Sequence, residues 1–204
     1  MTGLRAIAVR GVTRRYGSAW VLRGVEVRFE PGSLTVVEGA NGAGKSTLMG
    51  IVGGLVHPTA GAVTWEPGGL EVGLRRHAIG WVGHESSSYR ELTAEENVAL
   101  VALANGVSRD VVPRCLDRVG AAGLSERRVG TLSRGQKQRV ALARGIVHAP
   151  ELLLLDEPFT GLDTKGCEML ELVLRQERDR GAIVLVVSHD ASLAARLGAS
   201  ALWI

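Results

Sequence analysis

The chain has 204 residues, of which 46% are hydrophobic and 22% are charged. That length and apolar content suit one globular unit with a full core and exclude a disordered chain. The net charge of +3 is small and the arginine pairs are scattered, which argues against a surface that binds nucleic acid. The longest apolar runs fall far short of a membrane span, and the two cysteines match no metal or redox spacing.

The first part of the chain predicts several strands and one helix. Alternating apolar residues over 4–30 are typical of strands, and an apolar, β-branched run at 34–37 predicts a buried strand. We expect a helix over 45–55 and further strands at 62–65 and 79–82. Proline and glycine break the chain between these elements.

The middle of the chain, from about residue 85 to 148, has helical spacing instead. Thr93 and Glu96 form a capping box, which predicts a helix that runs to about Ala104. Another helix is expected to begin at Ser108.

The last part of the chain resembles the first in its pattern. Apolar runs at 151–155 and 182–187 predict buried strands, with a helix that has one apolar face between them. A short helix is expected at 193–197 and an edge strand at 201–204. Strands that alternate with helices indicate a parallel sheet covered by helices, an α/β architecture.

A phosphate-binding loop lies between the predicted strand and helix at 39–46, which read Gly-Ala-Asn-Gly-Ala-Gly-Lys-Ser. Small residues let backbone N–H groups surround phosphate oxygens at a helix N-terminus. Lys45 supplies a positive charge for the β- and γ-phosphates, and Ser46 offers a hydroxyl to Mg²⁺. The residues that we expect to bind nucleotide here are Gly39, Asn41, Gly42, Gly44, Lys45, Ser46 and Thr47.

Two carboxylates follow the predicted strand of four leucines at 152–155. Ligands of open α/β sheets bind at the carboxyl ends of the strands, where these two side chains emerge. We expect Asp156 to hold Mg²⁺ through water and Glu157 to orient or deprotonate the attacking water. A solvated acidic turn is the alternative, and a phosphate loop in the same chain argues against it.

A second anion site is expected at Leu132-Ser133-Arg134-Gly135-Gln136. Ser133 would cap a helix that runs to about Val147, and Gly135 keeps the backbone open near the helix start, where free N–H groups attract anions. A second anion site beside a single phosphate loop suggests that it serves the nucleotide of another subunit. An ordinary capped helix is the alternative.

These motifs, in this order, resemble the ATP-binding subunits of ABC transporters over nearly the whole chain. The resemblance implies that Ser133, Gly135 and Gln136 bind nucleotide, that Asp163 lies at a dimer interface, and that His189 contacts the γ-phosphate in catalysis. It also implies that Tyr16 stacks on adenine. The alternative is a structural role, in which Tyr16 packs at the end of a strand.

The resemblance also implies a fold and a domain division. The fold is an α/β P-loop NTPase (RecA-like) core with a parallel sheet, an N-terminal antiparallel β subdomain and an inserted helical subdomain. We expect a single ABC ATPase domain over 1–204, with a core at about 1–84 and 149–204 and a helical subdomain at about 85–148.

Two residues depart from the usual pattern. Residues 132–136 resemble the signature loop of the family, in which Arg134 stands at the position of the first glycine. His84 stands where the family usually has a glutamine that touches Mg²⁺. We expect His84 to offer a ring nitrogen to the metal. The stretches at 81–84, 91–97 and 156–163 resemble one branch of the family, the ATP-binding subunit of the cytochrome c maturation haem exporter (the CcmA family).

The resemblance therefore implies ATP hydrolysis that energises an integral-membrane permease subunit, with ATP and Mg²⁺ as cofactors. It implies a head-to-tail homodimer with two ATP molecules at its interface, peripheral to the cytoplasmic face of a bacterial inner membrane, and no nucleic-acid partner. Haem export in cytochrome c biogenesis is the expected process, and export of a different small molecule, a lipid or a drug is the alternative.

Overall fold

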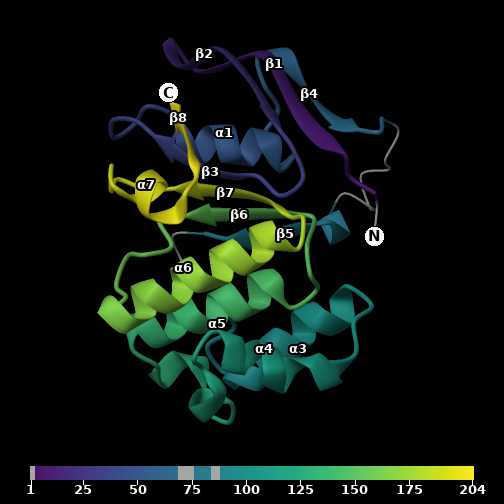
Figure 1. Cartoon of the computed structure of the whole chain (residues 1–204), viewed down its shortest axis with the longest axis vertical. Helices are drawn as coiled ribbons and strands as arrows, with labels where there is room; N and C mark the ends of the chain where they lie inside the picture. Colours follow the sequence, from purple (N-terminus) through teal and green to yellow (C-terminus); the bar gives the residue numbers. More distant parts are fainter. Residues whose placement is uncertain (1–2, 69–75, 84–87) are drawn as a thin grey trace.

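The computed structural model describes residues 3–68, 76–83 and 88–204. Two sheets lie one above the other, with a helix between them and further helices on the far side of the lower sheet (Figure 1). Within the described ranges, no helix is both long and apolar enough to cross a membrane.

The upper sheet has three antiparallel strands in the order β2 (Ala19–Phe29), β1 (Ala6–Tyr16) and β4 (Ala60–Glu66). The first four residues of β1 are apolar and buried, and Ile7, Val9 and Val12 belong to the apolar cluster between the two sheets. This sheet confirms the predicted N-terminal antiparallel subdomain.

The lower sheet has five parallel strands in the order β5 (Ile79–Val82), β6 (Leu152–Asp156), β7 (Ile183–Val187), β3 (Leu34–Glu38) and β8 (Ser200–Trp203). The central strands are buried on both faces, so β6 and β7 are almost entirely apolar, whereas β3 also contains the buried Thr35 and Glu38. Since all five strands run the same way, their carboxyl ends lie along one edge. The predicted parallel sheet is confirmed, with β8 at its edge.

Helix α1 (Lys45–Val52) lies between the two sheets (Figure 1). Leu152 and Leu154 of β6 belong to the apolar cluster on this side, while Leu153 and Leu155 belong to the cluster on the other side. The period of two along a strand thus divides the four leucines between two layers of the core. The helix ends at Val52 and not near residue 55, because Gly53 and Gly54 follow it and Gly54 is left-handed at φ 72°.

The other helices lie on the far side of the lower sheet (Figure 1). Thr93 caps α3 with both hydrogen bonds of the predicted capping box, to and from Glu96. The longer helices there are α3 (Ala94–Ala104), α4 (Val112–Arg118), α5 (Arg134–Ile146) and α6 (Thr164–Asp179). Shorter pieces are α7 (Leu193–Leu197) and the 3₁₀ turns η1 (Arg109–Val111), η2 (Ala122–Leu124) and η3 (Val129–Thr131). Helices α5, α6 and α7 contact strands of the lower sheet, and α3 and α4 pack against α5.

Candidate nucleotide-binding site

The phosphate loop connects the end of β3 to the first residue of α1. Gly44 precedes the helix in the left-handed region at φ 104°, where other residues are strained. A Cβ atom on Gly44 would lie 2.7 Å from Cγ1 of Val21 and 2.8 Å from Cδ2 of Leu22. Glycine is therefore required here both by backbone conformation and by the approach of β2.

Lys45 holds the loop from inside. Only 6% of the residue is exposed, and its Nζ donates hydrogen bonds of 2.9 Å to the carbonyl oxygens of Gly39 and Ala40. The cation is thus kept beneath the loop at the start of a helix, where the helix dipole adds to the positive potential. This is the arrangement that attracts phosphate.

A hollow of about 440 Å³ opens beside the loop, at the edge where the carboxyl ends of the parallel strands meet. It brings together most of the nucleotide-site residues that the sequence predicts. The lining residues are Tyr16, Val21, Asn41, Gly42, Gly44, Lys45, Ser46, Thr47, Asp156, Glu157, Val187 and His189. Gly39 is not among them, and it contributes its carbonyl oxygen to Lys45 instead.

Glu157 sits in this hollow with an unusual backbone. Its φ of 51° is left-handed, which costs free energy in a residue that has a Cβ atom. Its N–H donates to the carbonyl oxygen of Val187 at the end of β7. The strained conformation thus joins the ends of two neighbouring strands and sends the carboxyl group into the site.

The electrostatics of Glu157 suit a proton acceptor. Burial raises the pKa of this carboxyl above its usual range, and the nearby Asp156 raises it further, while His189 and Lys45 lower it. Oε1 of Glu157 lies 3.1 Å from Nε2 of His189. A carboxylate with a raised pKa is a stronger base than an exposed one.

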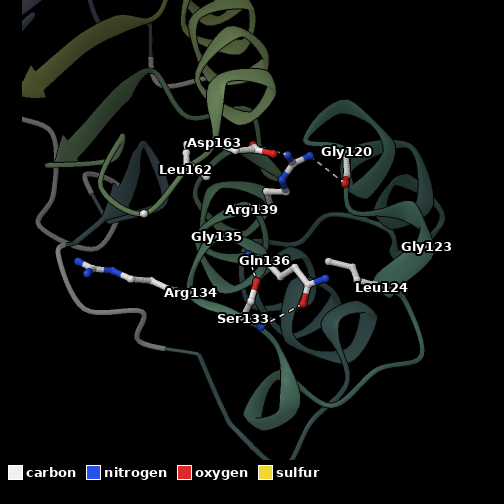
Figure 2. A pocket seen from close by; sticks show the side chains of 11 residues that line it. Gly120, Gly123, Leu124, Ser133, Arg134, Gly135, Gln136, Arg139, Leu162 and Asp163 are labelled. Atoms are coloured by element: carbon white, nitrogen blue, oxygen red, sulfur yellow. Dashed lines mark hydrogen bonds and ion pairs between the residues drawn. The ribbon is translucent and has the colours of Figure 1, made fainter.

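A second hollow, of about 630 Å³, lies where α5 begins (Figure 2). Ser133 caps α5 and accepts a 3.3 Å hydrogen bond from the N–H of Gln136, whose Oε1 accepts from the N–H of Ser133 at 3.0 Å. The predicted cap is therefore confirmed as a reciprocal capping box. The residues that line this hollow are Gly120, Gly123, Leu124, Ser133, Arg134, Gly135, Gln136, Arg139, Gly161, Leu162 and Asp163.

Asp163 closes the second hollow from the start of α6. Its Oδ1 accepts a 2.8 Å hydrogen bond from the N–H of Gly166 and lies 3.6 Å from Nη2 of Arg139. Nη1 of Arg139 donates to the carbonyl oxygen of Gly120 at 3.2 Å, so this arginine joins three segments (Figure 2). Among the described residues, none lines both hollows.

The family described as ABC transporter matches residues 22–160, which is most of the chain. The chain belongs to the ABC transporter family. It is an ATP-binding subunit of such a transporter and an ATPase.

Several curated proteins are similar to this ABC ATPase over most of their length. The lipoprotein-releasing system ATP-binding protein LolD of Geobacter metallireducens is 38% identical, with 94% of this chain and 92% of that protein covered. The cytochrome c biogenesis ATP-binding export protein CcmA of Pseudomonas putida is 38% identical, with 83% of each covered. The lantibiotic transport ATP-binding protein SrtF of Streptococcus pyogenes is 33% identical, with 91% of this chain and 81% of that protein covered.

A solved ABC cassette has the same fold. The dimeric structure of the bacterial ABC transporter cassette MJ0796 superposes with a TM-score of 0.86 at 29% identity, covering 97% of this chain and 94% of that one. A post-hydrolysis state of the same cassette, bound to ADP and Pi, has a TM-score of 0.86 at 28% identity. The predicted fold class is confirmed by this likeness.

One predicted metal residue of the ABC ATPase cannot be placed. His84 lies outside the described residues, as does part of the expected boundary between core and helical subdomain near residues 84–85. The prediction for His84 stays a prediction.

Sequence reasoning missed a neighbour of Tyr16. The guanidinium of Arg14 lies over the Tyr16 ring, 4.4 Å from its centroid, and Nη1 of Arg14 donates to the carbonyl oxygen of His57. Residues two apart in a strand share one face, so this pair had a local signal in the sequence. Arg139 had none, because its partners Gly120 and Asp163 lie far along the chain.

Proposed function

We propose that two copies of this ABC ATPase clamp two ATP molecules between the first hollow of one copy and the second hollow of the other. Lys45, Ser46 and Thr47 hold the phosphates from one side, and Ser133, Gly135 and Gln136 close over them from the other. The separation of the two hollows in one chain carries this proposal, because no described residue lines both of them. The dimeric MJ0796 cassette supports it.

Residues of the first hollow have distinct roles in this proposal. Tyr16 stacks on adenine, while Gly39, Asn41, Gly42 and Gly44 shape the loop. The remaining roles belong to Glu157 as the base toward the attacking water, His189 as the contact to the γ-phosphate, and Asp163 as an interface residue.

Mg²⁺ fits the oxygen groups of the first hollow. The Ser46 hydroxyl and the Asp156 carboxylate both line it, and Mg²⁺ prefers one or two such oxygens together with phosphate and water. Among the described residues, no three carboxylate, cysteine or histidine side chains group as a metal cage, which agrees with an ion held mainly by its nucleotide. The bound ion would neutralise charge on the phosphates. His84 is proposed as a further ligand.

The proposed chemistry is then positioning and proton acceptance. The loop and Lys45 fix the triphosphate, and Glu157 accepts the proton of the water that attacks the γ-phosphorus. Loss of the γ-phosphate removes the group that both copies share, so the clamp opens. We propose that this opening drives a conformational change in an integral-membrane permease, which the dimer contacts at the cytoplasmic face of the cell membrane.

Glu157→Gln tests the clamp. The amide cannot accept the proton, so we expect turnover to fall about 10²–10³-fold while ATP still binds. The variant should elute as a dimer with ATP and as a monomer without it in size-exclusion chromatography with light scattering. Rapid hydrolysis by a variant that stays monomeric would contradict the assignment.

For the process that it energises, we propose haem export in cytochrome c biogenesis. The likeness to CcmA and the branch-like stretches at 81–84 and 156–163 support it. The alternative is export of another small molecule, a lipid or a drug, and the likenesses to LolD and SrtF favour that class.

For either process, we propose one ABC domain over 1–204, with a core at about 1–84 and 149–204 and a helical subdomain at about 85–148.

Purification of the chain with its membrane subunit separates these processes. A haem-handling partner, with haem visible in the absorption spectrum of the complex, is the result expected from the proposal. A partner that extracts lipoproteins or exports peptides would contradict haem export and leave the ATP clamp intact.

A further inference from the structure

Arg134 is the first residue of α5, at the mouth of the second hollow. The first turn of α5 contains no acidic residue. A cation at a helix N-terminus is repelled by the helix dipole, so Arg134 adds positive charge where the helix already presents it. Nothing in α5 itself therefore explains an arginine at this position.

The Arg134 guanidinium is exposed and unpaired. Within residues 3–68, 76–83 and 88–204, it has no hydrogen-bond or ion-pair partner. Arg139, in the same hollow, is paired with Asp163 and with the carbonyl oxygen of Gly120. Figure 2 shows Arg134 extending away from these groups and from the Ser133–Gln136 pair.

The stem of Arg134 is nevertheless held in place. Gly161, in the loop between β6 and α6, is left-handed at φ 83°, and a Cβ atom there would lie 2.9 Å from Cδ and 3.0 Å from Cγ of Arg134. The methylene groups thus pack on the bare backbone of Gly161. This contact restricts the side chain while it leaves the five N–H donors of the guanidinium available.

The charge of the second hollow favours an anion. Its charged lining residues are Arg134, Arg139 and Asp163, which sum to one net positive charge, and Asp163 is already paired. A terminal phosphate carries about two negative charges and offers several acceptor oxygens, which match the planar fork of a guanidinium. The unpaired charge in the hollow therefore belongs to Arg134.

We propose that Arg134 donates hydrogen bonds to the γ-phosphate of ATP held in the phosphate loop of a second copy of this chain. The proposal rests on the proposed clamp and adds a residue to it. A guanidinium thereby supplements the backbone N–H groups of the signature loop. Because ADP lacks the γ-phosphate, Arg134 makes closure of the dimer selective for the triphosphate.

Four substitutions in the Glu157→Gln background test this role. Arg134→Ala and Arg134→Gly remove the guanidinium, Arg134→Lys keeps the charge without the fork, and Arg127→Ala removes an exposed arginine that does not line the hollow. The dimer dissociation constant is measured by sedimentation with saturating MgATP and again with MgADP. ATP affinity is measured at concentrations where the protein is monomeric, and thermal unfolding confirms that each variant folds.

The loss of one charge-assisted contact is expected to cost about tenfold per site. With two sites per dimer, Arg134→Ala and Arg134→Gly should raise the dissociation constant of the MgATP dimer about 100-fold. The dissociation constant of Arg134→Lys should lie between those of these variants and that of the parent. Arg127→Ala should match the parent. ATP affinity of the monomer should be the same in all variants, because the phosphate loop is intact.

Three results overturn the role of Arg134. An Arg134→Gly dimer as tight as the parent shows that the guanidinium is idle, and a tighter one shows that it obstructs closure. Equal weakening in MgATP and MgADP shows that it contacts protein and not the γ-phosphate. Failure of the proposed clamp has a different signature, because the Glu157→Gln parent with Arg134 intact would then remain monomeric in MgATP.

Discussion

The two hollows differ in how they are built. The first hollow, beside the phosphate loop, lies at the carboxyl ends of buried parallel strands. In it Lys45 is 6% exposed and burial raises the pKa of Glu157. The second hollow lies at the N-terminal ends of α5 and α6, and the side chain of Asp163 in its lining is 73% exposed. The fold of a single copy is therefore enough to bury Lys45 in the first hollow and to shift the pKa of Glu157. The charged groups of the second hollow stay in contact with water until a partner covers them.

This contrast predicts that the two hollows fail in different ways. Lys45→Ala removes the buried cation, so we expect ATP affinity of the monomer to fall about 100-fold or more. Ser133→Ala should leave monomer affinity unchanged and abolish ATP-driven dimerisation in the Glu157→Gln background. Titration with a fluorescent ATP analogue and light scattering measure the two effects. Undiminished affinity in Lys45→Ala would refute the contrast.

A buried carboxylate in α6 ties that helix to α4. Glu177 is fully buried and accepts hydrogen bonds from Arg118, which joins α4 to α6, and from Arg180 at the end of α6 itself. Glu177→Ala removes these charge-assisted hydrogen bonds from two guanidinium groups that are 33% and 29% exposed. The loss should cost about 2 kcal/mol of unfolding free energy. Denaturant titration measures this, and Asp179→Ala, on an exposed pair of the same helix, should cost under about 0.5 kcal/mol.

The raised pKa of Glu157 predicts two pH effects of opposite sign. In the proposed mechanism hydrolysis needs the Glu157 carboxylate, so turnover should fall as pH drops through the raised pKa, at a higher pH than for an exposed glutamate. In the folded state the proton is held more tightly than in the unfolded state. The protonated Glu157 therefore contributes to the free energy of unfolding. That contribution is fully present below the pKa of the unfolded state and is lost as pH rises through the pKa of the folded state.

Glu157→Gln separates these two effects. The variant should unfold at a higher temperature than the parent near pH 8, and the gain should vanish near pH 4, where the parent is protonated. Thermal unfolding without nucleotide across this range is the measurement. A gain that does not change with pH would show that burial of the charge is not the cause.

The smallest effect is expected at the exposed acid of the second hollow. Asp163→Asn keeps an oxygen that can cap α6, and its exposed pairing with Arg139 contributes little, so stability should change by under about 0.5 kcal/mol. Asp163→Ala removes the cap and should cost about 1 kcal/mol. Equal costs in the two variants would mean that the ion pair, and not the cap, holds the start of α6.

Much of the fold and of both hollows was predictable because its signals are local. The phosphate loop, the capping boxes at Thr93 and Ser133, and the carboxylates after β6 each depend on residues within a few positions of one another. Hydrogen bonds over three or four residues and the period of two along a strand are set by backbone geometry alone. Their existence therefore followed from the residue order.

The contacts that join distant segments were not predictable in this way. The pairing of Arg118 with Glu177 spans 59 residues, and the packing of Arg134 on Gly161 joins the start of α5 to the loop after β6. The left-handed backbone of Glu157 is set by the neighbouring end of β7. Strand order places these groups together, and no spacing along the chain encodes it.

The amino-acid order alone determined which groups of this ABC ATPase we propose for phosphate, for metal and for the attacking water, because those motifs are short and their geometry is local. Only the tertiary structure decided that they form two separate hollows, that Glu157 is buried enough to have a raised pKa, and that the Arg134 guanidinium has no partner among the residues described. Burial and pairing depend on which segments the sheet and the helices bring into contact, and that is a property of the whole fold.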